Sequence, residues 1–173
     1  MYFETHITVE NADWLDSPDW IVMDNFRSGN VQEPISTHTF NKMKFQGTQH
    51  EAFMDAARTA SDFTEDGLKV LRVKTETGFF GTEHPLYYEQ HVKIEKSLDM
   101  LEPWEFFGAH AALSAPRHRK FFYVTVRAFT APEFDYLCKE LNQQVSTMSP
   151  VQATFRTEVA VWDSNQELDA AWL

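Results

Sequence analysis

The sequence has little cysteine, glycine or basic residue, and it lacks any long apolar segment. Its single cysteine, Cys138, rules out a disulfide framework within one chain and fits a reducing compartment. No apolar run approaches the ~20 residues that a membrane-spanning helix needs. The N-terminus has no basic region followed by an apolar signal segment. We therefore expect a cytoplasmic protein that does not enter a membrane.

Basic residues are outnumbered, with 15 Lys and Arg against 26 Asp and Glu, so the net charge is −11. A negative protein repels phosphate backbones, and nucleic acid is therefore not an expected partner. Hydrophobic residues make up 43 % of the 173 residues and include fifteen Phe, enough for a packed core. A small-molecule ligand and a homo-oligomer both remain open.

Strong cofactor motifs are also missing. The sequence contains no His-Glu-x-x-His motif, no cysteine pair and no Asp-rich calcium loop. Its six scattered glycines form no phosphate-binding loop. We therefore predict no certain cofactor, and a divalent metal held by paired Glu and His side chains remains an alternative.

The chain repeats itself. Residues 4–10 (ETHITVE) recur as residues 89–95 (EQHVKIE) at an offset of 85. Two further matches follow in the same order, each at an offset of 82: a Thr three residues before a Glu, and a basic-Thr-Glu triplet. They pair residues 48–51 with 130–133 and residues 74–76 with 156–158. We predict a first repeat over 1–83 and a second over 84–173, together forming one compact pseudo-two-fold unit.

Each repeat predicts the same order of elements. Apolar and polar residues alternate in the segments that we expect to be strands. A Thr-x-x-Glu capping box precedes each expected helix. The predicted strands are 2–10, 37–46 and 68–76 in the first repeat and 87–95, 119–129 and 151–162 in the second; the predicted helices are 49–63 and 131–146. The connection 11–35 reads as largely irregular, and 98–114 predicts a helix on at least one side of Pro103.

Strand, connection, strand, helix, strand is a layout typical of ferredoxin-like modules, in which helices cover one face of an antiparallel sheet. We therefore predict an α+β fold built from two duplicated ferredoxin-like modules. The free sheet faces of the two modules would oppose each other across a cleft or pack into one core.

The candidate site follows from the duplicated first strand. Residues at i and i+2 of a strand share a face, so His6 lies with Glu4 and Thr8, and His91 lies with Glu89. A His beside a carboxylate can act as a general base or bind a metal. We predict His6 and His91 as catalytic residues. The predicted ligand-binding residues are Thr8, Lys93, Glu4, Glu89, Glu76 and Glu158. The competing interpretation is a plain solvated strand face with paired charges.

The segment His6-Ile7-Thr8-Val9 resembles the His-x-Thr-hydrophobic motif of the two-histidine phosphoesterase superfamily, the 2′,5′ RNA ligase-like proteins. Those proteins are also duplicated, and one such motif from each half lines a central cleft. The resemblance implies that His6 and His91 act as acid and base, and that Thr8 binds phosphate. The second copy carries Lys93 at the hydroxyl position.

Two functions are compatible with this sequence. The first is a hydrolase or phosphoesterase-like enzyme that acts on a small ligand in a cleft between the repeats. The second is a non-catalytic ligand-binding or protein-interaction protein, which would use aromatic residues in the connections as a contact surface. Those residues are Trp14, Trp20, Trp104, Phe106 and Phe107.

Overall fold

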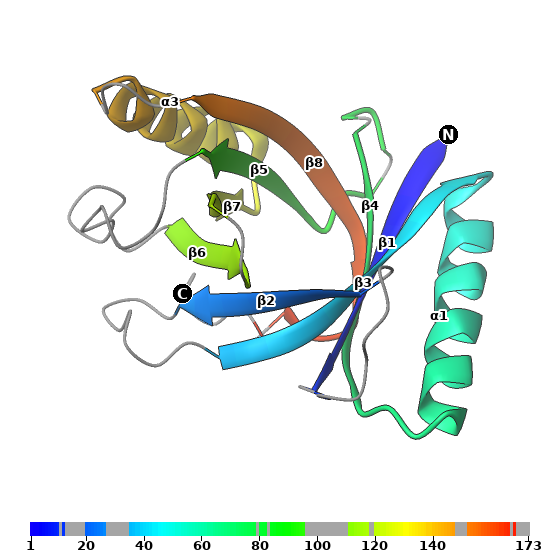
Figure 1. Ribbon diagram of the computed structural model, residues 1–173. Coiled ribbons are helices and arrows are strands. Elements are labelled where there is room, and N and C mark those ends of the chain that lie inside the picture. The colour runs from blue at the N-terminus through cyan, green and yellow to red at the C-terminus, as the bar shows by residue number, and fades with distance from the viewer. Residues whose placement is uncertain are drawn as a thin grey trace. The chain divides into compact units, whose positions relative to one another are not determined.

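A computed structural model gives the fold of this protein (Figure 1). It describes residues 1–10, 12, 20–26, 35–78, 80–82, 84–95, 111–117, 120–147, 152–166 and 168. Side chains of residues 25, 26, 35 and 41–44 are outside this description.

The described residues form eight strands and two helices. The strands are β1 (Tyr2–Glu10), β2 (Trp20–Phe26), β3 (Ile35–Gln46), β4 (Val70–Thr77), β5 (Tyr87–Ile94), β6 (Ala111–Pro116), β7 (Phe122–Ala128) and β8 (Ala153–Asp163). The helices are α1 (Gln49–Glu65) and α3 (Ala131–Thr147). No helix among the described residues is long and apolar enough to cross a membrane.

The strands hydrogen-bond in the order β1-β3-β2-β6-β7-β5-β8-β4, and β4 pairs back with β1, so the sheet closes as a barrel. The prediction of an α+β fold made of ferredoxin-like modules is therefore wrong. Six strands and both helices lie close to their predicted positions, but the described residues of each half contain one strand more than predicted. The order β4-β1-β3-β2 in the first half corresponds to β8-β5-β7-β6 in the second.

The two additional strands, β2 and β6, lie in the connections that the sequence left unassigned to strands. Strand β2 belongs to the segment that reads as irregular, and it has no clean alternation of apolar and polar residues. Strand β6 reads Ala-Ala-Leu-Ser-Ala-Pro, and alanine favours helices over strands. It forms a strand by pairing with β7, where Leu113 lies opposite Val124 and both are buried. The helix expected next to Pro103 lies outside the described residues.

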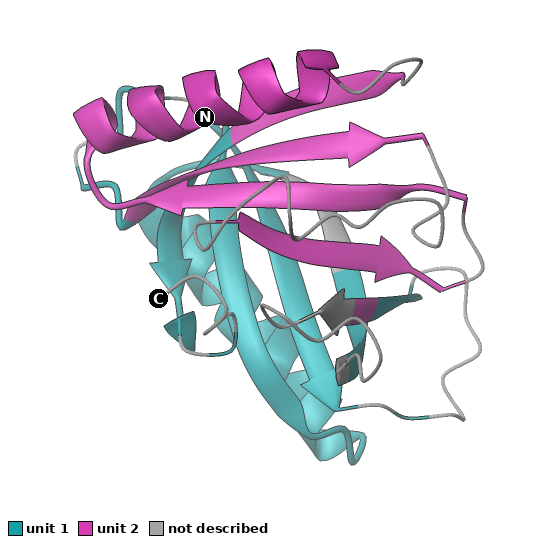
Figure 2. Ribbon diagram, turned by 90° about the vertical axis from the view of Figure 1, so that its left-hand side faces the viewer, with its two compact units in different colours: residues 1–23, 36–86, 158–168 teal, residues 24–35, 87–157, 169–173 magenta. Residues whose placement is uncertain are grey.

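The chain forms two compact units, coloured in Figure 2. Unit 1 comprises residues 1–23, 36–86 and 158–168. Unit 2 comprises residues 24–35, 87–157 and 169–173. Strand β8 begins in unit 2 and ends in unit 1, because residue 158 lies inside it. The division into repeats at residue 83 and their pseudo-two-fold relation stay predictions.

In unit 1, helix α1 packs on β1 and β4. The apolar residues of β1, among them Ile7 and Val9, are fully buried and pack with Ala56 of the helix. Trp20 extends this core by packing against Phe40 and Phe63, with ring centroids 5.2 and 5.0 Å away. Trp20 is thus a packing residue of unit 1. The other four aromatic residues predicted as a contact surface, Trp14, Trp104, Phe106 and Phe107, lie outside the described residues.

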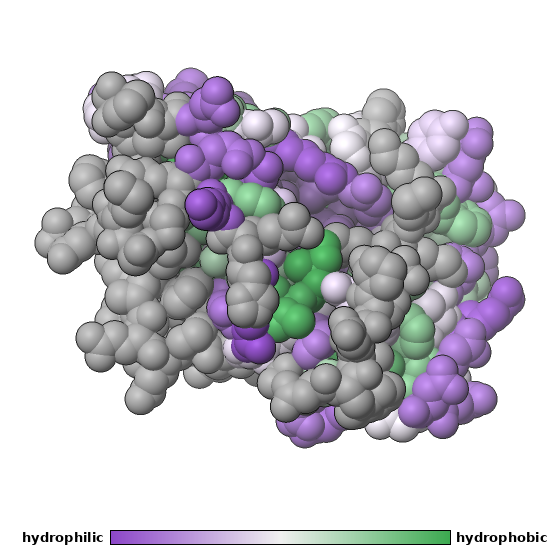
Figure 3. Space-filling view, viewed as in Figure 1, coloured by the Kyte–Doolittle hydropathy of each residue, from purple (hydrophilic) through white to green (hydrophobic). Residues whose placement is uncertain are grey.

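In unit 2, helix α3 packs on β5 and β7. Val92 and Ile94 of β5 alternate with polar residues and are fully buried. Leu141 and Val145 of α3 pack on the same cluster. Each unit therefore has one sheet face covered by a helix, and the strand alternation places polar side chains on the opposite face. On the side of the molecule drawn in Figure 3, hydrophilic side chains predominate among the coloured residues.

The predicted capping box of α1 is confirmed. The Glu51 amide donates to Thr48 Oγ1, and the Thr48 amide donates to Glu51 Oε2. At α3 the Glu133 amide donates to Thr130 Oγ1 over a longer distance of 3.4 Å. Here the Glu133 carboxylate accepts from the amide of Phe129. The two helix starts thus share a design and differ in their bonding.

Candidate functional site

Buried charged side chains line the polar sheet face of each unit. Charged groups are rarely buried without a partner, because leaving water is costly. In unit 1 the buried charged residues are Arg72, Lys74, Glu76, Glu158 and Asp163, and in unit 2 they are Glu89 and Arg127. A plain solvated strand face would leave such residues exposed, so that interpretation does not describe these positions.

His6 in unit 1 lies beside a buried carboxylate. Its Nε2 is 3.1 Å from Glu76 Oε2, and Lys74 Nζ is 2.7 Å from Glu76 Oε1. Strand pairing explains the arrangement, because β1 and β4 place Glu4 opposite Glu76 and His6 opposite Lys74. The His6 side chain is 24 % exposed and that of Glu76 only 1 %. A partly accessible imidazole is thus held against a buried acid.

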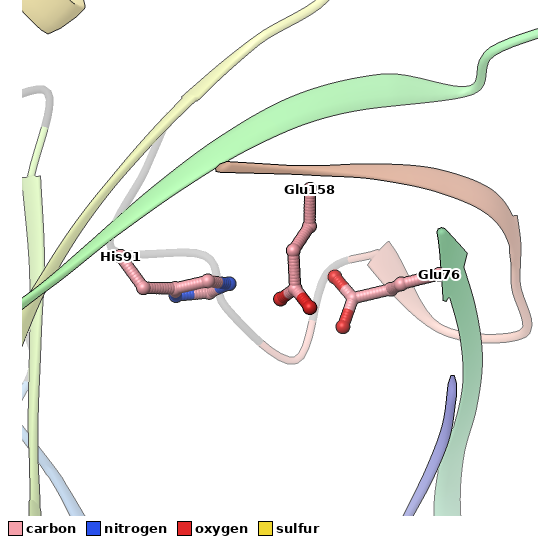
Figure 4. Close-up of side chains that lie close together, drawn as sticks. All are labelled: Glu76, His91 and Glu158. Atoms are coloured by element: carbon pink, nitrogen blue, oxygen red, sulfur yellow. The ribbon is translucent and has the colours of Figure 1, made fainter. Parts of the chain in front are cut away.

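A second buried carboxylate of unit 1, Glu158, comes from β8. Carboxylate oxygens of Glu76 and Glu158 lie within 4.8 Å of each other, and Figure 4 shows the two groups facing one another. Two neighbouring carboxylates repel when both are ionised. The ammonium of Lys74 offsets part of this charge. The sequence predicted both carboxylates as site residues, and the structure brings them together.

Another buried ion pair of unit 1 joins β4 to β8. Arg72 Nε and Nη2 donate to the two carboxylate oxygens of Asp163, at 2.9 and 2.6 Å. This bidentate geometry matches the planar guanidinium fork to a carboxylate. The pair joins β4 to β8 beside Lys74 and Glu76. The sequence analysis did not identify it.

His91 in unit 2 has partners on two strands. Its Nδ1 lies 2.8 Å from Thr125 Oγ1, on the directly opposite position of β7. Its Nε2 lies 3.5 Å from Glu89 Oε2, two residues earlier on β5. Arg127, opposite Glu89, donates from Nε and Nη2 to Glu89 Oε1. The result is a connected row of four side chains.

Packing fixes the arginine of this row. The Arg127 guanidinium lies 4.0 Å from the ring centroid of the fully buried Tyr87. A cation over an aromatic face is attracted by the ring quadrupole. Arg127 therefore contacts Tyr87 on one side and Glu89 on the other. In this position it orients the carboxylate that faces His91.

The polar face of unit 2 continues to Lys93. Its Nζ forms an ion pair with Glu95 Oε1 and lies 4.2 Å from the ring centroid of Phe121. Strand pairing places Lys93 opposite Tyr123, whose ring packs edge-on against Phe121 at 5.5 Å. Partial burial raises the pKa of Tyr123, and the charge of Lys93 works against that rise.

The remaining predicted site residues, Glu4 and Thr8, lie on β1 with His6, Glu4 partly buried and Thr8 buried. Among the other histidines, His38 is buried and its Nδ1 accepts from the Ala12 amide at 3.3 Å. His50 and His84 are exposed. His6 belongs to unit 1 and His91 to unit 2, so the prediction that they line one cleft stays a prediction.

Sequence reasoning missed Thr125 and Arg127. The signal was present, because alternation along β7 places Tyr123, Thr125 and Arg127 on one face. What the sequence lacked was the register that puts Thr125 opposite His91 and Arg127 opposite Glu89.

Comparisons with known proteins give no family. No family model matches this sequence, and no curated protein matches it. A solved structure titled as an anthrone oxidase-like protein is similar over 94 % of this chain and 92 % of its own, with 8 % sequence identity and a TM-score of 0.30. A likeness at this level carries no argument about activity.

Proposed function

We propose that this protein is an acid–base enzyme of the hydrolase class that acts on a small molecule, with His91 as the residue that moves the proton. The observation that supports the proposal is the position of the His91 imidazole, between the Thr125 hydroxyl and the Glu89 carboxylate. A residue oriented by neighbours in this way is what general acid–base catalysis requires.

The two partners suit both protonation states of the imidazole. The Glu89 carboxylate, when ionised, only accepts hydrogen bonds, so it favours a proton on His91 Nε2. The Thr125 hydroxyl can donate to Nδ1 of the neutral ring, or rotate and accept from Nδ1–H of the charged ring. The neutral and the charged form of His91 can therefore both keep the two partners.

Arg127 has a positioning role in this proposal. Both of its bonds go to Glu89 Oε1, and Oε2 is the oxygen nearest to His91. The arginine thus fixes the rotation of the carboxylate and leaves Oε2 facing the histidine. A catalytic group must be held within a fraction of an ångström, and packing of this kind achieves it.

His6 would take the complementary role, as the resemblance to two-histidine phosphoesterases implies, with Thr8 binding the substrate. Its own carboxylate, Glu76, is buried and contacts Lys74. We also propose a cytoplasmic location, which the single cysteine supports.

The test is hydrolysis of a panel of p-nitrophenyl carboxylic esters and of bis-p-nitrophenyl phosphate. We expect the wild-type protein to hydrolyse at least one of them, and His91→Gln to lower kcat/KM by about 10²–10⁴-fold. His50→Gln is the matched control, because His50 is exposed at the start of α1. It should retain wild-type kcat/KM.

Two results would overturn the proposal. One is a wild-type protein that hydrolyses none of the esters. The other is a His91→Gln variant with wild-type kcat/KM. Circular dichroism of His91→Gln checks that the variant is folded, so that a loss of activity is not caused by a loss of structure.

A further inference from the structure

Lys93 lies next to His91 on the same sheet face, at the edge of the row formed by Arg127, Glu89 and His91. Two residues of strand cover roughly 7 Å, so the Cα atoms of Lys93 and His91 lie about that far apart on one face of β5. Both side chains are partly accessible, His91 at 24 % and Lys93 at 31 %. A small ligand could touch both at once.

An aromatic residue holds the ammonium in place. Lys93 Nζ lies over the Phe121 ring, and Phe121 packs edge-on against Tyr123. Strand pairing puts the half-buried Tyr123 directly opposite Lys93. The lysine is therefore also held by a contact that does not involve an acid.

The carboxylate partner, Glu95, is attached less firmly. It follows the last residue of β5, and its side chain is 40 % exposed. Ion pairs at such exposure contribute little, because water solvates both groups almost as well. Glu95 can thus turn into solvent at low cost, and the ammonium is then available to another anion.

We propose that Lys93 anchors an anionic group of the substrate, and that Glu95 is an internal competitor which this group displaces. The inference rests on the proposed function and names its substrate class: a small molecule that carries a carboxylate or phosphate group. The surrounding charges support it. The charge of Glu89 is already paired with that of Arg127, so release of Glu95 leaves the lysine as a local positive charge in a chain of net charge −11.

The test measures the dissociation constants of inorganic phosphate and of acetate by NMR titration, following resonances of Lys93 and His91. We expect Lys93→Gln to weaken binding of the preferred anion by about tenfold or more, because a charge-assisted contact is lost. Glu95→Gln should tighten binding several-fold, because the competitor is gone. A gain of affinity cannot arise from a damaged fold.

Matched controls come from the exposed ion pair of Lys69 and Glu10 in unit 1, whose Nζ–Oε1 distance is 2.9 Å. Lys69→Gln and Glu10→Gln should leave both dissociation constants unchanged. The comparison of phosphate with acetate shows which anion the anchor prefers.

The inference is overturned if the wild-type protein binds neither anion, if Lys93→Gln binds as tightly as wild type, or if Glu95→Gln does not tighten binding. His91→Gln separates this result from the proposed function. It should lower kcat/KM for hydrolysis by about 10²–10⁴-fold and retain anion binding, whereas failure of the anchor alone leaves hydrolysis dependent on His91.

Discussion

Arg127 donates from both Nε and Nη2 to a single oxygen of Glu89, at 3.0 and 2.7 Å, and both side chains are almost completely buried. This relationship gives the Glu89 carboxylate a counter-charge at its position next to His91. The guanidinium charge balances that of the carboxylate, and the cost of moving two charges out of water is offset by a short, directional contact.

We expect removal of one partner to be far more damaging than removal of both. Arg127→Gln should lower the free energy of unfolding by about 3–5 kcal/mol, because Glu89 is left buried without its counter-charge. The double variant Glu89→Gln/Arg127→Gln should recover a large part of this loss. Urea denaturation of both single variants and the double variant gives the coupling energy. Strictly additive losses would contradict a coupled pair.

Local patterns in the sequence predicted six of the eight described strands and both helices. Alternation identifies β1 and β5 clearly, because Ile7, Val9, Val92 and Ile94 are buried on the helix side. The ring of strands was not predictable, because it depends on β2 and β6. The alanines of β6 carry no strand preference of their own, and pairing with β7 decides their conformation.

The candidate site was predictable to the same extent. Spacing of two residues placed Glu89 with His91 on one face, and the structure gives 3.5 Å between Glu89 Oε2 and His91 Nε2. Thr125 and Arg127 are 34 and 38 residues away from their partners in sequence. Only the register of β5 against β7 selects them, and register depends on the whole sheet.

The two helix caps should differ in strength. Thr48→Ala should lower the free energy of unfolding by about 1 kcal/mol, through loss of a complete capping box. Thr130→Ala should cost less, because its bond is longer, at 3.4 Å. Urea denaturation measures both, and Thr48→Ser serves as the control that keeps the hydroxyl. Equal losses at the two sites would contradict this difference.

Acid should weaken the cap of α1. Hydrogen bonds from the Thr48 amide and then its hydroxyl lower the pKa of Glu51 below its ordinary value of 4.5. A lowered folded-state pKa contributes stability that is present above pH 4.5 and is lost as pH falls through the folded-state pKa. The stability difference between wild type and Glu51→Gln should therefore be constant near neutral pH and shrink in acid. A difference independent of pH would show that the carboxylate does not bond in the cap.

Tyr123 should report the charges around the proposed anchor. Burial raises its pKa above 10.0, Lys93 lowers it and Glu95 raises it. Lys93→Gln should therefore raise the pKa of Tyr123 further, and Glu95→Gln should lower it. Tyrosinate absorbance follows the titration, and subtraction of the curve of Tyr123→Phe removes the signal of the other tyrosines. Because the folded-state pKa is raised, the stability contributed by the phenol is present below pH 10.0 and is lost as pH rises through the folded-state pKa. Shifts of the opposite sign would contradict the placement of Lys93 and Glu95 beside Tyr123.

Cys138 should react slowly with thiol reagents. Burial, and then the charge of Asp135, raise the pKa of its thiol to about 11. The thiolate is the reactive form, and a free cysteine has a pKa of about 8.5. At pH 8 this difference reduces the thiolate fraction by roughly 200-fold, so alkylation by iodoacetamide should be slower than that of free cysteine by a factor on the order of 100. The rate is followed by mass spectrometry, with the urea-unfolded protein as the control that restores ordinary reactivity. Equal rates for the folded and unfolded protein would show that the thiol is not shielded by α3 packing.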